Sequence, residues 1–223
     1  TSEAEAMAAQ GHPDVIRGMV AAGHEICSHG YGWIDYQYMD EAQEREHMLE
    51  AIRILTDPKA FALAPRRVTV STSGVLPQIA PLLEVAPIHL AVSLHATTDA
   101  VRDVLVPLNK RFPIAELLET LREEPRINRR RPVFFEYTLM KGVNDSLDDA
   151  RRLPGLLHGI PSKVNIIPMN PHPDAPYEPP SKTTVDRFAA VLHDAGVRVT
   201  LRRDRGRDID AACGQLANRK AGA

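Results

Sequence analysis

After Pro65 the sequence repeats one pattern: a run of apolar and β-branched residues, a short polar segment, and then an amphipathic helix. Near-continuous apolar strands that alternate with helices are typical of a parallel sheet or a (β/α) barrel. In such folds the chemistry gathers at the carboxyl ends of the strands. We therefore predict an α/β fold whose site lies at that edge. The five predicted strands cover residues 67–74, 89–95, 133–139, 163–168 and 197–202.

Helix signals complete this pattern. Asp40 is a suitable N-cap, and Pro58 disfavours helix in the residue before it, so a helix is predicted over residues 41–55. With a helix over residues 13–22, the N-terminal part is expected to be mainly helical. Later helices are predicted over residues 114–122, after the caps Asn144-Asp145-Ser146, and from Ser181 to Gly196, with Val185, Phe188 and Leu192 on one face.

Composition excludes several classes of protein. Of the 223 residues 43% are hydrophobic, which suffices for a core, and no stretch approaches the roughly 18 apolar residues of a membrane span. We therefore expect no membrane partner. The two cysteines, Cys27 and Cys213, form no disulfide framework, so a cytoplasmic location is expected. A first residue other than Met leads us to expect a truncated reading frame or a processed end.

Charge is distributed unevenly along the chain. The net charge is −2, but residues 1–50 contain ten acidic and two basic residues, a net of −8. Residues 51–223 contain 19 acidic and 25 basic residues, a net of +6. The basic part favours an anionic partner, and the shift suggests that the two parts have different histories.

A collinear series of motifs covers the basic part. It comprises Ala51–Pro58, Arg66–Gly74, Ala91–Ala96, Val106–Asn109, Glu136-Tyr137, Gly142–Asp145, Asn165–Pro171 and Asp208–Leu216. This series resembles the C-terminal part of the dual-specificity radical S-adenosylmethionine (SAM) methyltransferases, which modify adenine C2 in 23S ribosomal RNA and transfer RNA. The resemblance covers about residues 51–217. It implies a partial radical SAM (β/α) barrel made of the later strands and helices.

The resemblance also implies a mechanism and a set of site residues. In that family a cysteine takes a methyl group from SAM, and reductive cleavage of a second SAM produces the radical that leads to attack on adenine C2. Cys213 matches the methylated cysteine. The positions that match SAM contacts are Ser71, Ser93, Leu94, His95 and Asn170. Expected cofactors are SAM and a [4Fe–4S] cluster; expected partners are RNA and an electron donor such as flavodoxin or ferredoxin.

The residue types themselves leave simpler alternatives open. A thiolate is a soft nucleophile that can accept a methyl group, yet a lone cysteine beside two alanines is more often a small buried hydrophobe. For Ser71 the simpler alternative is a residue that merely ends a strand. For His95 it is a polar residue whose hydrogen bonds are satisfied within the protein. Two groups of arginines suit either contacts with RNA phosphates or simply a solvated surface. The first comprises Arg126, Arg129, Arg130 and Arg131, and the second Arg202, Arg203, Arg205 and Arg207. Relatives usually have an acidic residue at position 207 and Thr at 204, unlike this chain.

The sequence motif that holds the iron–sulfur cluster in that family is missing from this chain. The family holds its cluster with a Cys-x-x-x-Cys-x-x-Cys motif, and the two cysteines of this chain cannot supply three thiolates. The family's second catalytic cysteine and its upstream carboxylate are absent as well. We therefore expect that this chain alone does not methylate RNA.

The first fifty residues have a different resemblance. Val20–Tyr36 and Glu44–Met48 resemble the allantoinase-like branch of the polysaccharide deacetylases. His29 matches the first histidine of that superfamily's metal-binding pair, but Trp33 stands at the second position, so His24 and His29 are expected to cap or to hydrogen-bond.

We therefore predict two parts, residues 1–50 and 51–223, that join inside a helix near Glu50–Ile54, as in a mis-joined or recombined chimera. The alternatives to a methyltransferase fragment are a carbon–nitrogen hydrolase and a non-catalytic RNA-binding module.

Overall fold

The computed structural model describes residues 40–170 and 176–202. They fall into two compact units. The described part of the first comprises residues 40–69 and 82–88; that of the second comprises residues 70–81, 89–170 and 176–202.

The first unit is built around helix α3, Glu41–Thr56. The Asp40 side chain accepts a hydrogen bond from the backbone N–H of Gln43 at 2.9 Å, so the predicted N-cap is confirmed. The helix ends at Asp57, directly before Pro58, as predicted. A 3₁₀ turn, η2, then occupies Pro65–Arg67.

The sheet has five strands in the order β1-β2-β3-β4-β5. The pairs β2–β3, β3–β4 and β4–β5 are all parallel, which confirms the predicted α/β class. The strand bounds are β1 Thr69–Thr72, β2 His89–Ser93, β3 Val133–Leu139, β4 Ser162–Pro168 and β5 Val199–Leu201. The first strand is shorter than predicted at both ends. At its start η2, which Pro65 opens with its restricted φ, includes Arg67, and at its end the strand stops two residues before Gly74, whose φ is positive.

Helices connect the strands. They are α4 Leu76–Val85, α5 Asp99–Leu105, η3 Pro107–Lys110, α6 Ile114–Glu123, α7 Leu147–Leu156 and α8 Lys182–Asp194. The predicted caps Ser146 and Ser181 accept from the backbone N–H groups of Asp149 and Thr184. Helices α4 and α5 were not individually expected from the sequence, since Pro81 interrupts the first and the second buries an arginine.

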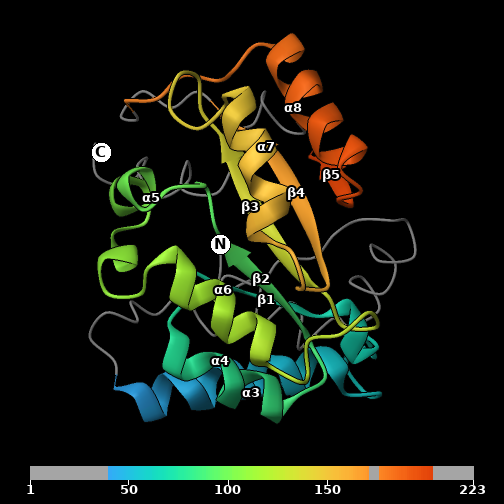
Figure 1. Cartoon of the computed structure of the whole chain (residues 1–223). Coiled ribbons are helices and arrows are strands. Elements are labelled where there is room, and N and C mark those ends of the chain that lie inside the picture. The colour runs from blue at the N-terminus through green and yellow to red at the C-terminus, as the bar shows by residue number, and fades with distance from the viewer. Residues whose placement is uncertain (1–39, 171–175, 203–223) are drawn as a thin grey trace, which may run out of the picture. The chain divides into compact units, whose positions relative to one another are not determined.

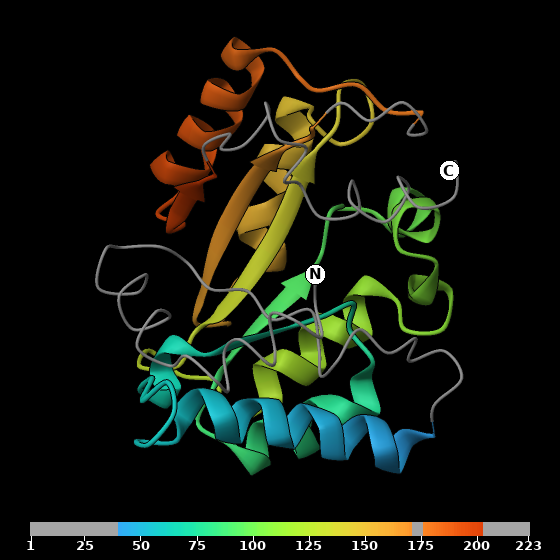
Figure 2. The ribbon, with the colours of Figure 1, turned by 180° about the vertical axis from the view of Figure 1, so that it is seen from behind.

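The sheet has two different faces. In β3 burial alternates strictly, with Val133, Phe135, Tyr137 and Leu139 fully buried. The Tyr137 ring contacts Phe188 of α8, so these residues face the helices. Helix α7 lies in front of β3 and β4 in Figure 1 and behind them in Figure 2. Within the described ranges no helix is long and apolar enough to cross a membrane.

Candidate functional site

The predicted SAM-contacting residues gather at the carboxyl edge of the sheet. Ser71 lies near the end of β1, and Ser93 is the last residue of β2, followed directly by Leu94 and His95. Asn170 lies two residues beyond the end of β4. Parallel strands end at the same edge, so the topology brings these positions to one side of the sheet. Leu94 differs from the others because the whole residue is buried, its backbone N–H donates to the Glu136 carbonyl, and its own carbonyl accepts from Arg102.

His95 has an unusual backbone conformation. Its φ is +56°, in the left-handed region that few residues other than Gly, Asn and Asp adopt. Its carbonyl accepts from the Asn144 amide at 2.6 Å, and its ring Nδ1 accepts from the backbone N–H of Thr138 at 3.1 Å. Nδ1 therefore carries no proton, and the neutral ring has its N–H at Nε2. Burial, and next the charge of Arg102, lower the pKa of His95 to about 4.

Asn144 holds the loop that follows β3. Its amide group donates to the carbonyls of His95 and Thr138, and its side-chain oxygen accepts from the backbone N–H of Met140. The Tyr137 hydroxyl donates to the Asn144 carbonyl at 3.0 Å. Asn144 is 1% exposed, so these bonds are shielded from water. The residue thus ties the loop after β2 to the loop after β3.

Backbone carbonyls at the ends of β1 and β2 converge on one cation. Arg102 of α5 is 1% exposed, and its guanidinium donates to Ser73, Ser93 and Leu94. The donor–acceptor distances are 2.8 Å to Ser73 O, 2.9 Å to Ser93 O and 3.1 Å to Leu94 O. The strand ends that carry the predicted SAM contacts are therefore linked by a buried arginine that sequence reasoning did not single out.

A row of polar side chains crosses the sheet from β2 to β5. Ser93 is paired in register with Glu136, Glu136 with Asn165, and Asn165 with Thr200. The Asn165 amide donates to Glu136 at 2.8 Å, and the Thr200 hydroxyl donates to Asn165. Burial raises the pKa of Glu136, although the Asn165 bond and Arg202 counteract it. The sequence shows that each of these four residues lies in a strand. Only the strand register in the structure shows that the four are aligned across the sheet.

Asn170 has the feature expected of a ligand contact. Its side-chain oxygen is buried, and no described residue donates a hydrogen bond to it. A buried acceptor left without a donor costs free energy, which a bound donor would recover. The donor groups of SAM, its amino and hydroxyl groups, suit such an acceptor. On this observation the residues present fit SAM.

Other predicted residues lie mostly outside the described part. Cys213, Arg203, Arg205 and Arg207 are among them. Arg202 is described: it is exposed, follows β5 directly, and its backbone N–H donates to Ile166 at 2.9 Å. It thus begins the second arginine group at the carboxyl edge of the sheet.

A [4Fe–4S] cluster does not fit the residues of this chain. Radical SAM clusters need three Cys thiolates, whereas this chain has two cysteines, neither in the described ranges. Among the described residues no group of three His, Cys, Asp or Glu side chains could hold a metal ion.

Solved structures define the class of protein. A radical SAM methyltransferase from Sphaerobacter thermophilus superposes with a TM-score of 0.70 at 44% identity, over 78% of this chain and 51% of that one. A domain of pyruvate-formate lyase-activating enzyme from Bacteroides vulgatus shares the fold alone, with a TM-score of 0.53 at 14% identity, over 71% of this chain and 91% of that domain. The α/β unit therefore has the fold of the corresponding part of a radical SAM methyltransferase.

Curated relatives narrow this class to one family. The dual-specificity RNA methyltransferase RlmN of Jannaschia sp. is 50% identical over 171 residues, which are 77% of this chain and 44% of the relative. RlmN of Dinoroseobacter shibae is 51% identical over 171 residues, 77% of this chain and 43% of the relative. Over this region the chain is about half identical to RlmN proteins. It spans less than half the length of these relatives.

The N-terminal part is similar to a second family. The polysaccharide deacetylase family model matches residues 4–66. This match and the methyltransferase match are together longer than the chain, so they share residues. The predicted join near residues 50–54 lies inside the deacetylase match and stays a prediction.

Proposed function

We propose that residues 51–217 are the C-terminal, SAM-binding part of an enzyme that methylates adenine C2 of ribosomal and transfer RNA. The observation that carries this proposal is the identity of about 50% to RlmN proteins over 171 residues. The strand-end placement of Ser71, Ser93 and His95 supports it, because ligands of parallel α/β folds bind at that edge.

Each proposed contact has a distinct role. SAM supplies the methyl group when it is bound. Ser71 and Ser93 offer hydroxyl groups, the neutral His95 ring offers its Nε2–H, and Asn170 offers a buried acceptor. Leu94 belongs to this set by resemblance alone, since its backbone groups are bonded to Glu136 and Arg102. In the proposal Cys213 accepts the methyl group as a thiolate, which is the reactive form of cysteine.

We further propose that this chain alone does not methylate RNA. Three thiolates are needed for the cluster, and an electron donor such as flavodoxin or ferredoxin would have to reduce it. Two cysteines cannot meet this requirement. The chain would then bind SAM without completing the reaction.

SAM binding to the purified chain tests the proposal. Titration calorimetry should detect SAM binding, and Asn170→Leu, which removes the buried acceptor, should weaken binding about tenfold. Asn128→Ala is the matched control, because Asn128 is exposed and precedes β3 at the opposite edge. A wild-type chain that binds no SAM would contradict the proposal. RNA methylation by the isolated chain would contradict its second part.

The similarity of residues 4–66 to polysaccharide deacetylases favours one alternative, a hydrolase that acts on carbon–nitrogen bonds. Turnover of allantoin by the purified chain would support it. Under the methyltransferase proposal no turnover is expected.

A further inference from the structure

Arg102 is the largest fully buried side chain among the described residues. A buried cation is costly unless its charge and its hydrogen-bonding groups find partners. The guanidinium makes four hydrogen bonds, three to backbone carbonyls and one to the side-chain oxygen of Asn109 at 3.0 Å. An arginine bonded through four of its five N–H groups holds its acceptors in place because its donors lie in one rigid plane.

The charge of Arg102 is balanced through an amide. The Asn109 side chain donates to Asp99 at 2.9 Å and to Asp103 at 2.7 Å, while its oxygen accepts from Arg102. Asp99 also accepts from the backbone N–H of Ile114, which ties α6 to the same cluster. Burial lowers the pKa of Arg102, and the two carboxylates oppose that shift. The cluster therefore keeps the cation charged inside the fold.

The carbonyls that Arg102 binds belong to peptide groups fixed on both sides. The Ser93 and Leu94 carbonyls accept from Arg102, and the N–H groups of the same two peptides, those of Leu94 and His95, donate to the Glu136 carbonyl. Two successive peptide planes are thereby clamped between α5 and β3. This clamp determines the backbone dihedrals of Leu94 and contributes to the left-handed conformation of His95.

The same guanidinium reaches the end of β1. Its Nη2 donates to Ser73, two residues after Ser71, and to Ser93. Gly74 follows with φ +100°, and a Cβ at that position would lie 3.6 Å from Arg102 Nη2. The arginine thus sets the separation between the loops that follow two strands.

We propose that Arg102 is a positioning residue that holds the loops after β1 and β2 in the geometry required for SAM binding. This inference rests on the proposed function, since it assigns SAM to that edge. Arg102 does not contact the ligand in this proposal. It acts through Ser93 and His95, whose side chains would be displaced if the carbonyls lost their common donor.

The test compares Arg102→Lys with Arg152→Lys. Lysine keeps the charge but cannot bind three carbonyls and an amide from one plane. Arg152 is a matched control because it too holds a buried carboxylate, that of Asp149, and Thr97, but no strand-end carbonyl. Arg102→Lys should weaken SAM binding about tenfold or more, as loss of a supporting residue commonly does. Arg152→Lys should leave the affinity within about twofold, both proteins being folded by circular dichroism.

A second variant covers the case in which Arg102→Lys does not fold. Asp103→Asn removes one of the two carboxylates that Asn109 binds, and Asp103 is only partly buried. It should weaken SAM binding by a few-fold with little loss of thermal stability. Amide resonances in a heteronuclear spectrum provide a readout that does not need SAM: those of Gly74, Leu94 and His95 should shift in Asp103→Asn and Arg102→Lys but not in Arg152→Lys.

The outcomes separate the two proposals. Absence of SAM binding to the wild-type chain would overturn the proposed function, while the amide shifts would still test the clamp. Wild-type SAM affinity in a folded Arg102→Lys protein, or unmoved amides at residues 93–95, would overturn the role of Arg102.

Discussion

His95 combines an uncommon backbone conformation with a half-buried, neutral ring. Two hydrogen bonds from distant residues, from Thr138 to its ring and from Asn144 to its carbonyl, hold it. The Thr138 N–H could not donate to Nδ1 of a charged imidazolium, because that nitrogen would itself be a donor. The site is therefore built around one protonation state of this histidine.

A pH dependence of stability follows. The pKa of His95 in the folded protein is about 4, below its ordinary value of 6.5, so the unfolded chain binds more protons between these values. Stability from this residue is complete above about pH 7 and falls as the pH is lowered towards 4, by about 3 kcal/mol at most. Urea unfolding between pH 7 and 4.5 should show a smaller loss in His95→Asn, since Asn tolerates positive φ and does not titrate. An equal loss in both proteins would refute this.

Gly74 is required by its conformation. Its φ is +100°, and an added Cβ would lie 3.1 Å from Leu117 Cδ1. Gly74→Ala should destabilise the protein by about 1–3 kcal/mol through backbone strain and this contact. Gly155→Ala is the control, since nothing lies within 4 Å of an added Cβ there and the residue is helical. That control should be neutral or stabilising by up to about 1 kcal/mol. Equal melting temperatures for the two variants would argue against the strain.

At the scale of elements, α7 is joined to the loop after β2 by a buried polar cluster. Asp149, in the first turn of α7, accepts from Thr97, from the cap Ser146 and from Arg152. Burial works against ionisation of Asp149, yet these hydrogen bonds hold its pKa below the ordinary value. The carboxylate therefore contributes stability at neutral pH, which is lost as the pH falls through its lowered pKa.

Thr97→Val tests that cluster. Valine keeps the shape but removes the hydroxyl donor to a carboxylate, which should cost about 1–3 kcal/mol of unfolding free energy. Thr120→Val is the control, because the Thr120 hydroxyl donates to the Glu116 carbonyl within one exposed helix face. Its cost should stay within about 1 kcal/mol. A Thr97→Val protein as stable as the control would show that the cluster contributes little.

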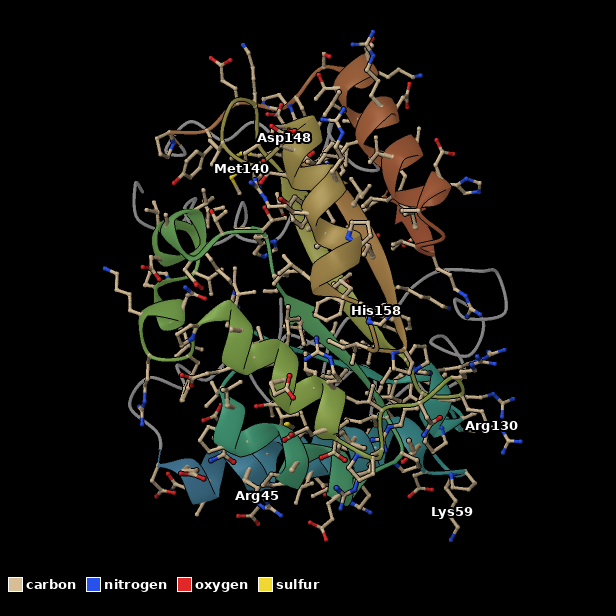
Figure 3. All side chains as sticks on the ribbon, viewed as in Figure 1. Arg45, Lys59, Arg130, Met140, Asp148 and His158 are labelled. Atoms are coloured by element: carbon tan, nitrogen blue, oxygen red, sulfur yellow. The ribbon has the colours of Figure 1, made fainter. Side chains whose placement is uncertain are left out.

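At the scale of the molecule, the first arginine group and Arg202, the described member of the second group, lie at different edges of the sheet. Arg130 precedes β3 and Met140 follows it, so they mark opposite edges of the sheet (Figure 3). Arg129 and Arg198 line a cavity of about 360 Å³ beside the starts of the strands. Arg202 follows the end of β5, at the edge where the proposed chemistry takes place.

RNA binding should therefore depend on the second group. Replacing Arg202, Arg203, Arg205 and Arg207 by Gln should weaken RNA binding and reduce the slope of log K against log salt by about 3, at roughly 0.7 per phosphate contact. Replacing Arg129 and Arg130 provides the comparison at the opposite edge and should change the slope by less. Fluorescence anisotropy with a labelled RNA stem–loop between 50 and about 300 mM salt measures both. A larger effect of the Arg129 and Arg130 change would reverse the assignment.

Local signals predicted much of this protein. Interactions within four residues or one helical turn could be predicted from the sequence. They include the caps Asp40, Ser146 and Ser181 and the buried face of α8. The strand-end positions of Ser93 and Asn170 followed from the same alternation. The motif series was enough to predict the RlmN-type family, which the relatives confirm.

Only the tertiary structure shows the contacts between residues that are distant in the sequence. Arg102 meets Ser73 across 29 positions, Thr138 meets His95 across 43, and Asn144 meets His95 across 49. No periodicity encodes such pairs, because they depend on which strands become neighbours and in what register. The sequence by itself thus determined the strands, several of the helices and the resemblance to RlmN proteins, while packing decided that a buried arginine joins two strand ends and that one histidine is neutral.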